Sequence, residues 1–286
     1  MSARRRLLFL VGGVLLVTLA VLEAGALHWN AGTRELREEL QSVAQTLEPR
    51  RYDAAMLDSL PAPVARYLRR VLKDGQPMID SARFTHRGRF NMGEDTPEWT
   101  RFSSDQLVVP SAPGFDWDGR ISLGPGISVR VHDAFVEGTG VLHASVAGLF
   151  TVAEMRATPE LAEAELQRYL AEAVWYPTAL LPGHGLSWSA IDDSTATATL
   201  VSGATTVSLE FGFDSAGLVR TARTDHRYRS VGKTLVPTPW EGRFQNYAER
   251  NGMLIPLQGE VAWLLPAGRW LYWQGELISV DHCFTP

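Results

Sequence analysis

The chain has 286 residues, a formal net charge of -5 and a single cysteine, Cys283. The acidic balance, with a pI near 5.8, excludes a typical nucleic-acid-binding protein, which would carry a concentrated basic patch. One cysteine cannot form an internal disulfide bond, so the folded part must depend on its hydrophobic core. Hydrophobic residues make up 45% of the chain, which is enough for such a core.

The first 27 residues predict a transmembrane anchor. Three arginines at residues 4–6 precede an apolar segment over residues 7–27 that only Glu23 interrupts. At 1.5 Å per residue this segment is roughly 31 Å long, enough to cross a hydrocarbon core of about 30 Å. Basic flanks stay in the cytoplasm, so residues 1–6 are expected to form a cytoplasmic tail. This predicts a single-pass inner-membrane protein whose C-terminal domain is periplasmic.

A cleaved signal peptide is the alternative interpretation of this segment. It would have the same basic start, and Ala24-Gly25-Ala26 is a tolerable cleavage site. The apolar run is longer than a typical signal core of 7–15 residues, which favours an uncleaved anchor. Trp29 also stands where an interfacial aromatic residue would lie. Both interpretations place the rest of the chain outside the cytoplasm.

Residues 28–78 predict a juxtamembrane helical region. Leucines and a valine at helical spacing indicate a helix over residues 33–47, with Thr33 as its N-cap. A second apolar stripe follows Pro63 and predicts another short helix. Its arginines are expected on a solvated face: Arg66, Arg69 and Arg70.

Residues 79–286 predict an antiparallel β domain. The pattern changes to a period of two, and about ten such segments are separated by hairpin-length turns such as Asn251-Gly252. One helix is expected to interrupt the strands over residues 159–176. The fold class is therefore α+β: a transmembrane helix, then a large curved antiparallel sheet, or half-barrel, whose concave side the inserted helix and the earlier helices cover.

The inserted helix carries the densest group of candidate ligand-binding residues. Arg168 and Glu172 are four residues apart and share one helix face, and Trp175 follows them. They form either a polar pair that looks into a cavity or an ordinary intrahelical ion pair, and the sequence leaves both open. The other candidates are aromatic residues that would line the inside of the sheet: Trp117, Trp240 and Tyr247.

No sequence motif predicts a metal site, a cofactor or a nucleophile. The seven histidines lack metal-binding spacing, and His132 and Asp133, as neighbours in a strand, should point to opposite faces. One enzyme hypothesis remains, in which Glu172 or Asp192 acts as general base with His184 nearby. The sequence leaves catalysis open and favours a non-catalytic protein.

Several blocks of the chain resemble a bacterial family known only as a domain of unknown function. The most specific are RYLAEAVWYPTALLP and PWEGRFQNYAERNGMLIP, and the likeness covers roughly residues 60–280. The architecture is also loosely similar to the lipoprotein carriers of the LolA and LolB type, which bind acyl chains in a half-barrel. That similarity implies an apolar ligand, although a membrane anchor departs from the soluble carrier.

The sequence thus leads to one preferred function and two alternatives. The preferred one is a membrane-anchored envelope protein that binds a lipid or another apolar small molecule in a half-barrel cavity. The alternatives are a hydrolase-like enzyme that uses an acidic residue with His184, and a non-catalytic scaffold with a filled core. The membrane and an apolar ligand are the expected partners, and no nucleic acid is expected.

Overall fold

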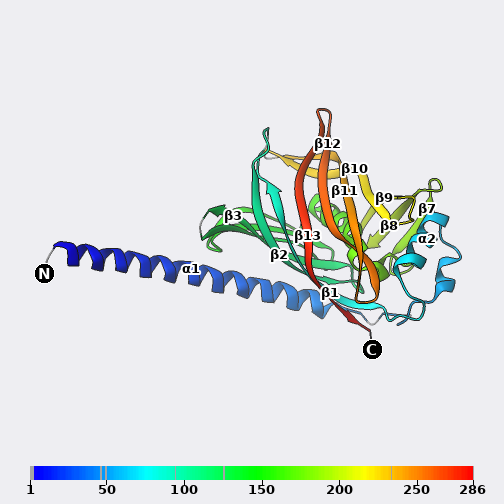
Figure 1. Cartoon of the computed structure of the whole chain (residues 1–286), viewed down its shortest axis with the longest axis horizontal. Coiled ribbons are helices and arrows are strands. Elements are labelled where there is room, and N and C mark those ends of the chain that lie inside the picture. Colours follow the sequence, from blue (N-terminus) through cyan, green and yellow to red (C-terminus); the bar gives the residue numbers. More distant parts are fainter. Residues whose placement is uncertain are drawn as a thin grey trace.

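The N-terminal helix projects far from the rest of the molecule (Figure 1). The structure is a computed structural model and describes residues 3–285 except residues 46, 49, 94, 125 and 233. Helix α1 (Ala3–Ser42) is long and apolar enough to cross a membrane, and the 18-residue apolar window within it is unburied. The predicted separate helix beginning at Thr33 is wrong, because α1 is continuous. The Thr33 hydroxyl donates back to the Trp29 carbonyl, 3.1 Å away, inside the helix.

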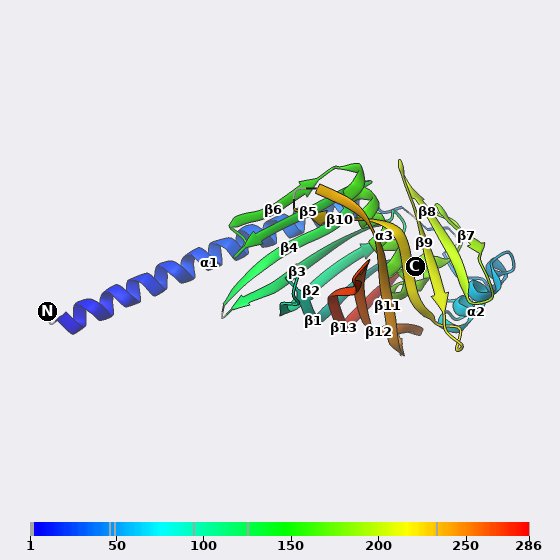
Figure 2. The same cartoon turned by 90° about the horizontal axis from the view of Figure 1, so that it is seen from above.

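The domain is built on one open antiparallel sheet of thirteen strands. Their order is β6-β5-β4-β3-β2-β1-β13-β12-β11-β10-β9-β8-β7, so the two halves of the chain join where β1 pairs with β13. The sheet is strongly curved (Figures 1 and 2). The strands are β1 (Ile79–Asn91), β2 (Trp99–Val109), β3 (Gly114–Gly124), β4 (Ile127–Val136), β5 (Thr139–Val146), β6 (Phe150–Arg156), β7 (Leu186–Ala190), β8 (Thr195–Ser202), β9 (Thr205–Phe213), β10 (Val219–Val231), β11 (Thr234–Arg250), β12 (Met253–Leu265) and β13 (Gly268–Phe284).

One helix connects the two halves of the sheet. Helix α3 (Pro159–Glu172) begins at its N-cap Thr158, whose hydroxyl accepts from the Leu161 amide, and continues into a 3-10 turn, η2 (Ala173–Trp175). A second 3-10 turn, η3 (Pro177–Leu180), follows. Because α3 contacts β3, β4 and β5 as well as β9 and β10, it spans the inside of the curve.

The main hydrophobic core lies between α3 and the face of the sheet that it covers, here called the inner face. Short helices η1 (Ala54–Leu57) and α2 (Ala62–Val71) add to this core at one end. Its largest fully buried side chains include Tyr67, Phe84, Phe115, Tyr176 and Phe211. The predicted α+β architecture of an apolar helix followed by a large curved antiparallel sheet is confirmed.

The second half of α1 lies on the opposite side of the sheet, here called the outer face. Leu36 and Leu40 pack there in a second apolar cluster with Leu107 and Val136. The prediction that the earlier helices join α3 on the concave side is therefore wrong for α1. Residues alternate between faces along a strand, and the outer face of β2–β5 presents apolar side chains that α1 buries.

Candidate functional site

A cavity of about 420 Å³ lies on the inner face between α3 and the sheet. Side chains from strands at both sides of the curve reach it, together with the end of α3 and η2. Ligand pockets for small molecules typically measure roughly 300–1,000 Å³ and are mainly apolar. The apolar part of this wall includes Trp117, Ile121, Val131, Trp175, Trp240 and Trp273.

The polar part of the wall is an ion cluster centred on Arg168. Its Nε donates to Glu172 Oε1 at 2.8 Å, and its Nη1 donates to Asp133 on β4. The second oxygen of Glu172 accepts from Gln106 Nε2 at 2.6 Å. The guanidinium also lies over the rings of Phe115 and Trp117, 5.0 and 5.1 Å from their centroids. Arg168 is thus held by two carboxylates and two aromatic faces.

These contacts keep Arg168 charged in a largely enclosed place. Burial lowers the pKa of the guanidinium, but the negative charges of Glu172 and Asp133 more than offset it, so the pKa is raised overall. The pair of Arg168 and Glu172 is therefore largely buried, unlike an ordinary surface ion pair, and its cation is already occupied by carboxylates. Arg168 does not offer an unpaired positive charge to the cavity.

A second cation, Arg227 on β10, lies across the cavity. Its Nη1 donates to the Ala164 carbonyl of α3, and its guanidinium lies 5.3 Å from the centroid of the Trp240 ring. The Trp240 indole donates to the Tyr272 hydroxyl at 2.8 Å, and the Tyr272 ring stacks on Trp263 at 5.5 Å. The polar atoms of these aromatic side chains are paired with the protein, so their ring faces supply the wall.

Glu165 lies beside this cluster on α3 and is almost completely buried. Burial, and next the negative charge of Asp133, raise the pKa of Glu165 well above its ordinary value. Its Oε2 has no hydrogen-bond partner among the residues that the structure describes. The carboxyl group is therefore held toward its neutral form, which keeps the cluster close to electrical balance.

His86 on β1 is packed behind the aromatic wall. Its ring lies 4.7 Å from Trp175 and 5.8 Å from Trp273, and neither ring nitrogen has a partner among the described residues. Burial, followed by the positive charge of Arg168, lowers the pKa of His86 to about 3. The imidazole is therefore neutral near pH 7 and acts there as part of an apolar core.

Five of the six predicted ligand-binding residues line this one cavity: Arg168, Glu172, Trp175, Trp117 and Trp240. Tyr247 does not. It lies further along β11, where its hydroxyl donates to the Val219 carbonyl at 2.8 Å and its ring packs on the main core. Trp29 is also not free at a membrane interface, because its ring is buried on the outer face and stacks on His132 at 4.4 Å.

The residues of the enzyme hypothesis are not assembled. His184 is exposed in the turn before β7, and Asp192 is exposed and accepts from the Ser194 amide at 2.7 Å, which caps a turn. Glu172 hydrogen-bonds to Arg168 and Gln106, and among the described residues no histidine hydrogen-bonds to it. No group of three metal-binding side chains occurs within the described part of the chain.

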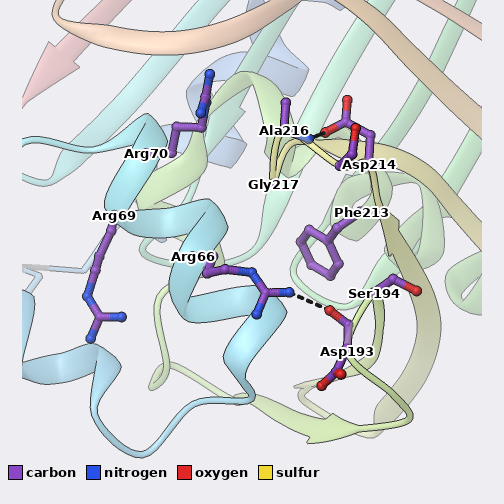
Figure 3. Close-up of a pocket in the computed structure, with 10 residues that line it drawn as sticks. Arg66, Arg69, Arg70, Asp193, Ser194, Phe213, Asp214, Ala216 and Gly217 are labelled. Carbon is purple, nitrogen blue, oxygen red and sulfur yellow. Dashed lines mark hydrogen bonds between the residues drawn. The ribbon is translucent and has the colours of Figure 1, made fainter.

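A second hollow, of about 580 Å³, opens on the surface between α2 and the loops at Asp193 and Asp214. Three arginines of α2 border it, but their guanidinium groups point in different directions (Figure 3). Arg66 donates to the Asp193 carbonyl, whereas Arg69 and Arg70 are exposed. This agrees with the solvated face that the sequence predicts, and the inner-face cavity remains the candidate site.

Comparison with known proteins identifies a family but no activity. The profile of a family of unknown function (DUF6920) matches residues 58–282. The chain belongs to this family. The predicted membership in a domain family of unknown function is thus confirmed, and no curated protein matches the chain.

Two solved structures show some similarity to this DUF6920 protein. One is the LolA superfamily protein NE2245 from Nitrosomonas europaea, with 13% identity and a TM-score of 0.37 over 72% of this chain and 88% of that one. The other is a beta-barrel-like protein of the domain of unknown function DUF1849 from Brucella abortus. Its identity is 11% and its TM-score 0.20, over 72% of this chain and 99% of that one.

Sequence reasoning missed several residues of the DUF6920 site, among them Asp133, Gln106, Glu165, His86 and Arg227. Asp133 was expected only to point away from His132, and this is confirmed: Asp133 binds Arg168, whereas His132 binds Asp116 on the outer face. These site residues could have been recognised as charged or amide side chains at positions of a strand that point into the core. The sequence alone does not show which positions of a strand point inward, so these residues could not be selected before the fold was known.

Proposed function

We propose that this protein is a membrane-anchored envelope protein that binds an apolar ligand, such as a lipid acyl chain, in the inner-face cavity. The cavity carries this proposal, because it is about 420 Å³ in volume and is lined mainly by aromatic and aliphatic side chains. An ordinary core of this kind would be filled to close packing. A filled scaffold is therefore less well supported than a binding protein.

The paired charges favour a ligand without a buried anionic group. Arg168 is already neutralised by Asp133 and Glu172, and Arg227 is held by a carbonyl and by the Trp240 ring. Bringing a carboxylate or phosphate into the cavity would cost desolvation energy, and the two carboxylates that hold Arg168 would repel it. The ligand's acyl part would occupy the cavity and any charged head would stay outside.

The packing of α1 favours an uncleaved anchor. Gly25 is buried against the β5–β6 turn, where a Cβ built on it would lie 2.2 Å from the Ala147 carbonyl oxygen. Gly25 stands inside the candidate cleavage site, and Trp29, which follows the site, is buried on the outer face, so the domain holds both sides of that site. Retained in this way, the predicted anchor of residues 7–27 would hold the protein in the membrane, with the arginines at residues 4–6 in the cytoplasm and the domain in the periplasm.

The test is binding of a fluorescent polyene fatty acid, and of its methyl ester, to the full chain in lipid nanodiscs. Ala144 lines the cavity and is buried, so Ala144→Phe should fill part of it and weaken binding of both probes at least several-fold. The matched control is Ala190→Phe on the exposed edge strand β7, which should bind like the wild type. The ester should bind at least as well as the acid, since Arg168 is already paired with two carboxylates that would repel a third.

Two results would overturn the proposal. Equal probe binding by the wild type and Ala144→Phe, with both folded by circular dichroism, would place the binding outside the cavity. An absence of probe binding to the wild type above empty nanodiscs would favour the scaffold alternative.

A further inference from the structure

One end of the inner face carries apolar side chains that the fold leaves exposed. They lie at the ends of the β3–β4 and β5–β6 hairpins, and their exposed fractions are 52% for Leu123, 48% for Ile127, 65% for Phe150 and 59% for Val152. These four residues are called the apolar lip. Apolar groups scattered singly over a surface are ordinary, but a contiguous group at one edge indicates a partner.

The apolar lip is continuous with the cavity. Leu123 and Ile127 follow the inward alternation of Ile121 and Val129, which pair with each other across β3 and β4 and line the cavity. Val152 itself lines the cavity. An apolar path therefore runs from the cavity outward to this end of the sheet.

The apolar lip lies beside the point where α1 leaves the domain. The two hairpins are neighbours, because Val129 on β4 pairs with Val146 on β5. Gly25 of α1 packs against Ala147 and Leu149 in the β5–β6 turn, next to Phe150. Figure 2 shows the ends of both hairpins pointing in the direction of the free N-terminal part of α1. The membrane that holds α1 would therefore lie directly in front of these hairpins.

Two arginines stand just behind the apolar lip on the outer face. Arg120 and Arg130 pair directly across β3 and β4, and neither takes part in a salt bridge with a described residue. Like charges in directly opposite positions destabilise a sheet, and the nearby carboxylate of Asp118 offsets only part of this repulsion, since the pKa of Arg130 is lowered overall. Burial, and next the charge of Arg120, lower the pKa of Arg130, and its Nη1 is buried without a described partner. An apolar tip backed by unpaired arginines complements the acyl and phosphate layers of an anionic bilayer.

We propose that the apolar lip rests in the surface of the bilayer that holds α1, so that the cavity opens toward membrane lipid. This rests on the proposed function, because it requires α1 to be the anchor. It deepens that function by naming the ligand class: a lipid of the same membrane enters the cavity along the inner face of β3–β6. Its head group would remain at the level of Arg120 and Arg130.

The experiment measures how deeply labelled side chains lie in the bilayer. The exposed native cysteine is removed by Cys283→Ser, and a fluorescent dye is attached to Leu123→Cys or Phe150→Cys in the full chain. The protein is reconstituted into vesicles of phosphatidylethanolamine and phosphatidylglycerol that contain lipids spin-labelled on the acyl chain. Matched controls are Leu16→Cys in the apolar segment of α1 and Ile191→Cys, an equally exposed apolar residue outside the apolar lip.

The proposal predicts blue-shifted emission and loss of fluorescence to the spin label at residues 123 and 150, as at residue 16, and neither effect at residue 191. It is overturned if residues 123 and 150 behave like residue 191 while residue 16 is quenched. In that case α1 is still a membrane anchor, and binding of the fluorescent fatty acid, measured on the same samples, still tests whether the cavity binds an apolar ligand. If residue 16 is also unquenched, the anchor itself is wrong and the membrane placement of the apolar lip falls with it.

Discussion

The two faces of strands β2–β4 use buried charge in opposite ways. On the outer face, Asp116 accepts from Arg37 at 2.7 Å and from His132 at 2.8 Å, and Asp118 accepts from the Trp29 indole at 3.0 Å. These contacts tie α1 to the sheet, and the hollow beside them, between α1 and β4–β6, is smaller, at about 270 Å³. On the inner face, the charges around Arg168 are just as fully paired, but they border about 420 Å³ of open space.

The difference separates a structural contact from a binding site. The outer network consists of groups from α1 and from the sheet that satisfy each other, and none of its side chains keeps an unpartnered buried polar atom among the described residues. In the inner cluster Arg168, Asp133 and Glu172 are also paired, but buried Glu165 Oε2 has no described partner, and the cluster faces a cavity that none of the described residues fills. Charge pairing alone therefore does not identify a site; charge pairing beside an unfilled apolar space does.

The largest expected effect comes from breaking the outer network at Asp116. Asp116→Ala removes the carboxylate that Arg37 and His132 share and leaves Arg37 with Asp105 alone, which should lower the free energy of unfolding by about 3–5 kcal/mol. Hydrogen exchange over residues 29–42 should rise as α1 leaves the sheet. Chemical denaturation of the full chain in nanodiscs measures the first effect, with exposed Asp95→Ala as control. A loss no larger than that of the control would show that the network does not hold α1.

A smaller loss is expected from the inner cluster. Arg168→Met leaves the carboxylates of Asp133 and Glu172 without a cation, at a cost of about 3 kcal/mol, part of which protonation of the acids relieves. Adding Asp133→Asn and Glu172→Gln should recover most of this loss, because the triple variant no longer has the two carboxylates that Arg168 neutralises. Denaturation curves of the two variants provide the comparison. A triple variant less stable than Arg168→Met would contradict the electrostatic account.

His86 predicts a pH dependence of stability. The folded chain keeps His86 neutral down to about pH 3, whereas the unfolded chain protonates it near its ordinary value of 6.5. Below pH 6.5 the unfolded state therefore binds the extra proton, and stability falls by about 1.4 kcal/mol per pH unit until about pH 3. Above pH 6.5 this contribution is fully present and constant.

The measurement is the difference in free energy of unfolding between the wild type and His86→Leu at several pH values. The raised pKa of Glu165 acts in the opposite direction, since a proton held by the folded state favours folding as the pH falls. It is present in both proteins and cancels in the difference. A difference that stays constant from pH 7 to pH 4 would contradict the burial of His86.

The smallest effect is expected at the exposed edge of the contact between α1 and the sheet. Arg156 on β6 lies 4.0 Å from Glu39, and their side chains are 55% and 39% exposed. Glu39→Ala should change the free energy of unfolding by less than about 1 kcal/mol, and the change should shrink at high salt. A larger loss of stability would mean that the exposed contact between Arg156 and Glu39, and not the buried network, holds α1 on the sheet.

Much of the fold could be predicted because ten of the strands alternate visibly in sequence. The three strands that were not predicted are β3, β6 and β7. β3 escapes the pattern because both of its faces are buried, so that Asp116 and Asp118 look like loop residues until α1 covers them. β6 and β7 are the edge strands and are only seven and five residues long, which leaves little alternation to read from the sequence.

The site could be predicted only where it follows local geometry. Arg168 and Glu172 are four residues apart, so they lie on the same face of a helix whatever the tertiary structure, and their spacing predicts the pair. Asp133 joins them because β4 lies under α3, which is a fact of tertiary packing. Tyr247 was chosen for its residue type, but its position along β11 places it beyond the cavity. Residue type therefore predicted that aromatic side chains line the cavity, but it could not predict which positions along each strand reach it.

The most direct measurement for the central claim is native mass spectrometry of the full chain released from nanodiscs, followed by extraction of bound lipid. A lipid site in the cavity predicts that the wild-type chain retains one lipid of the surrounding membrane. The Ala144→Phe chain should retain much less, while Ala190→Phe matches the wild type. Equal lipid retention by all three chains, or a wild-type chain free of lipid, would contradict the claim that the inner-face cavity is a lipid site.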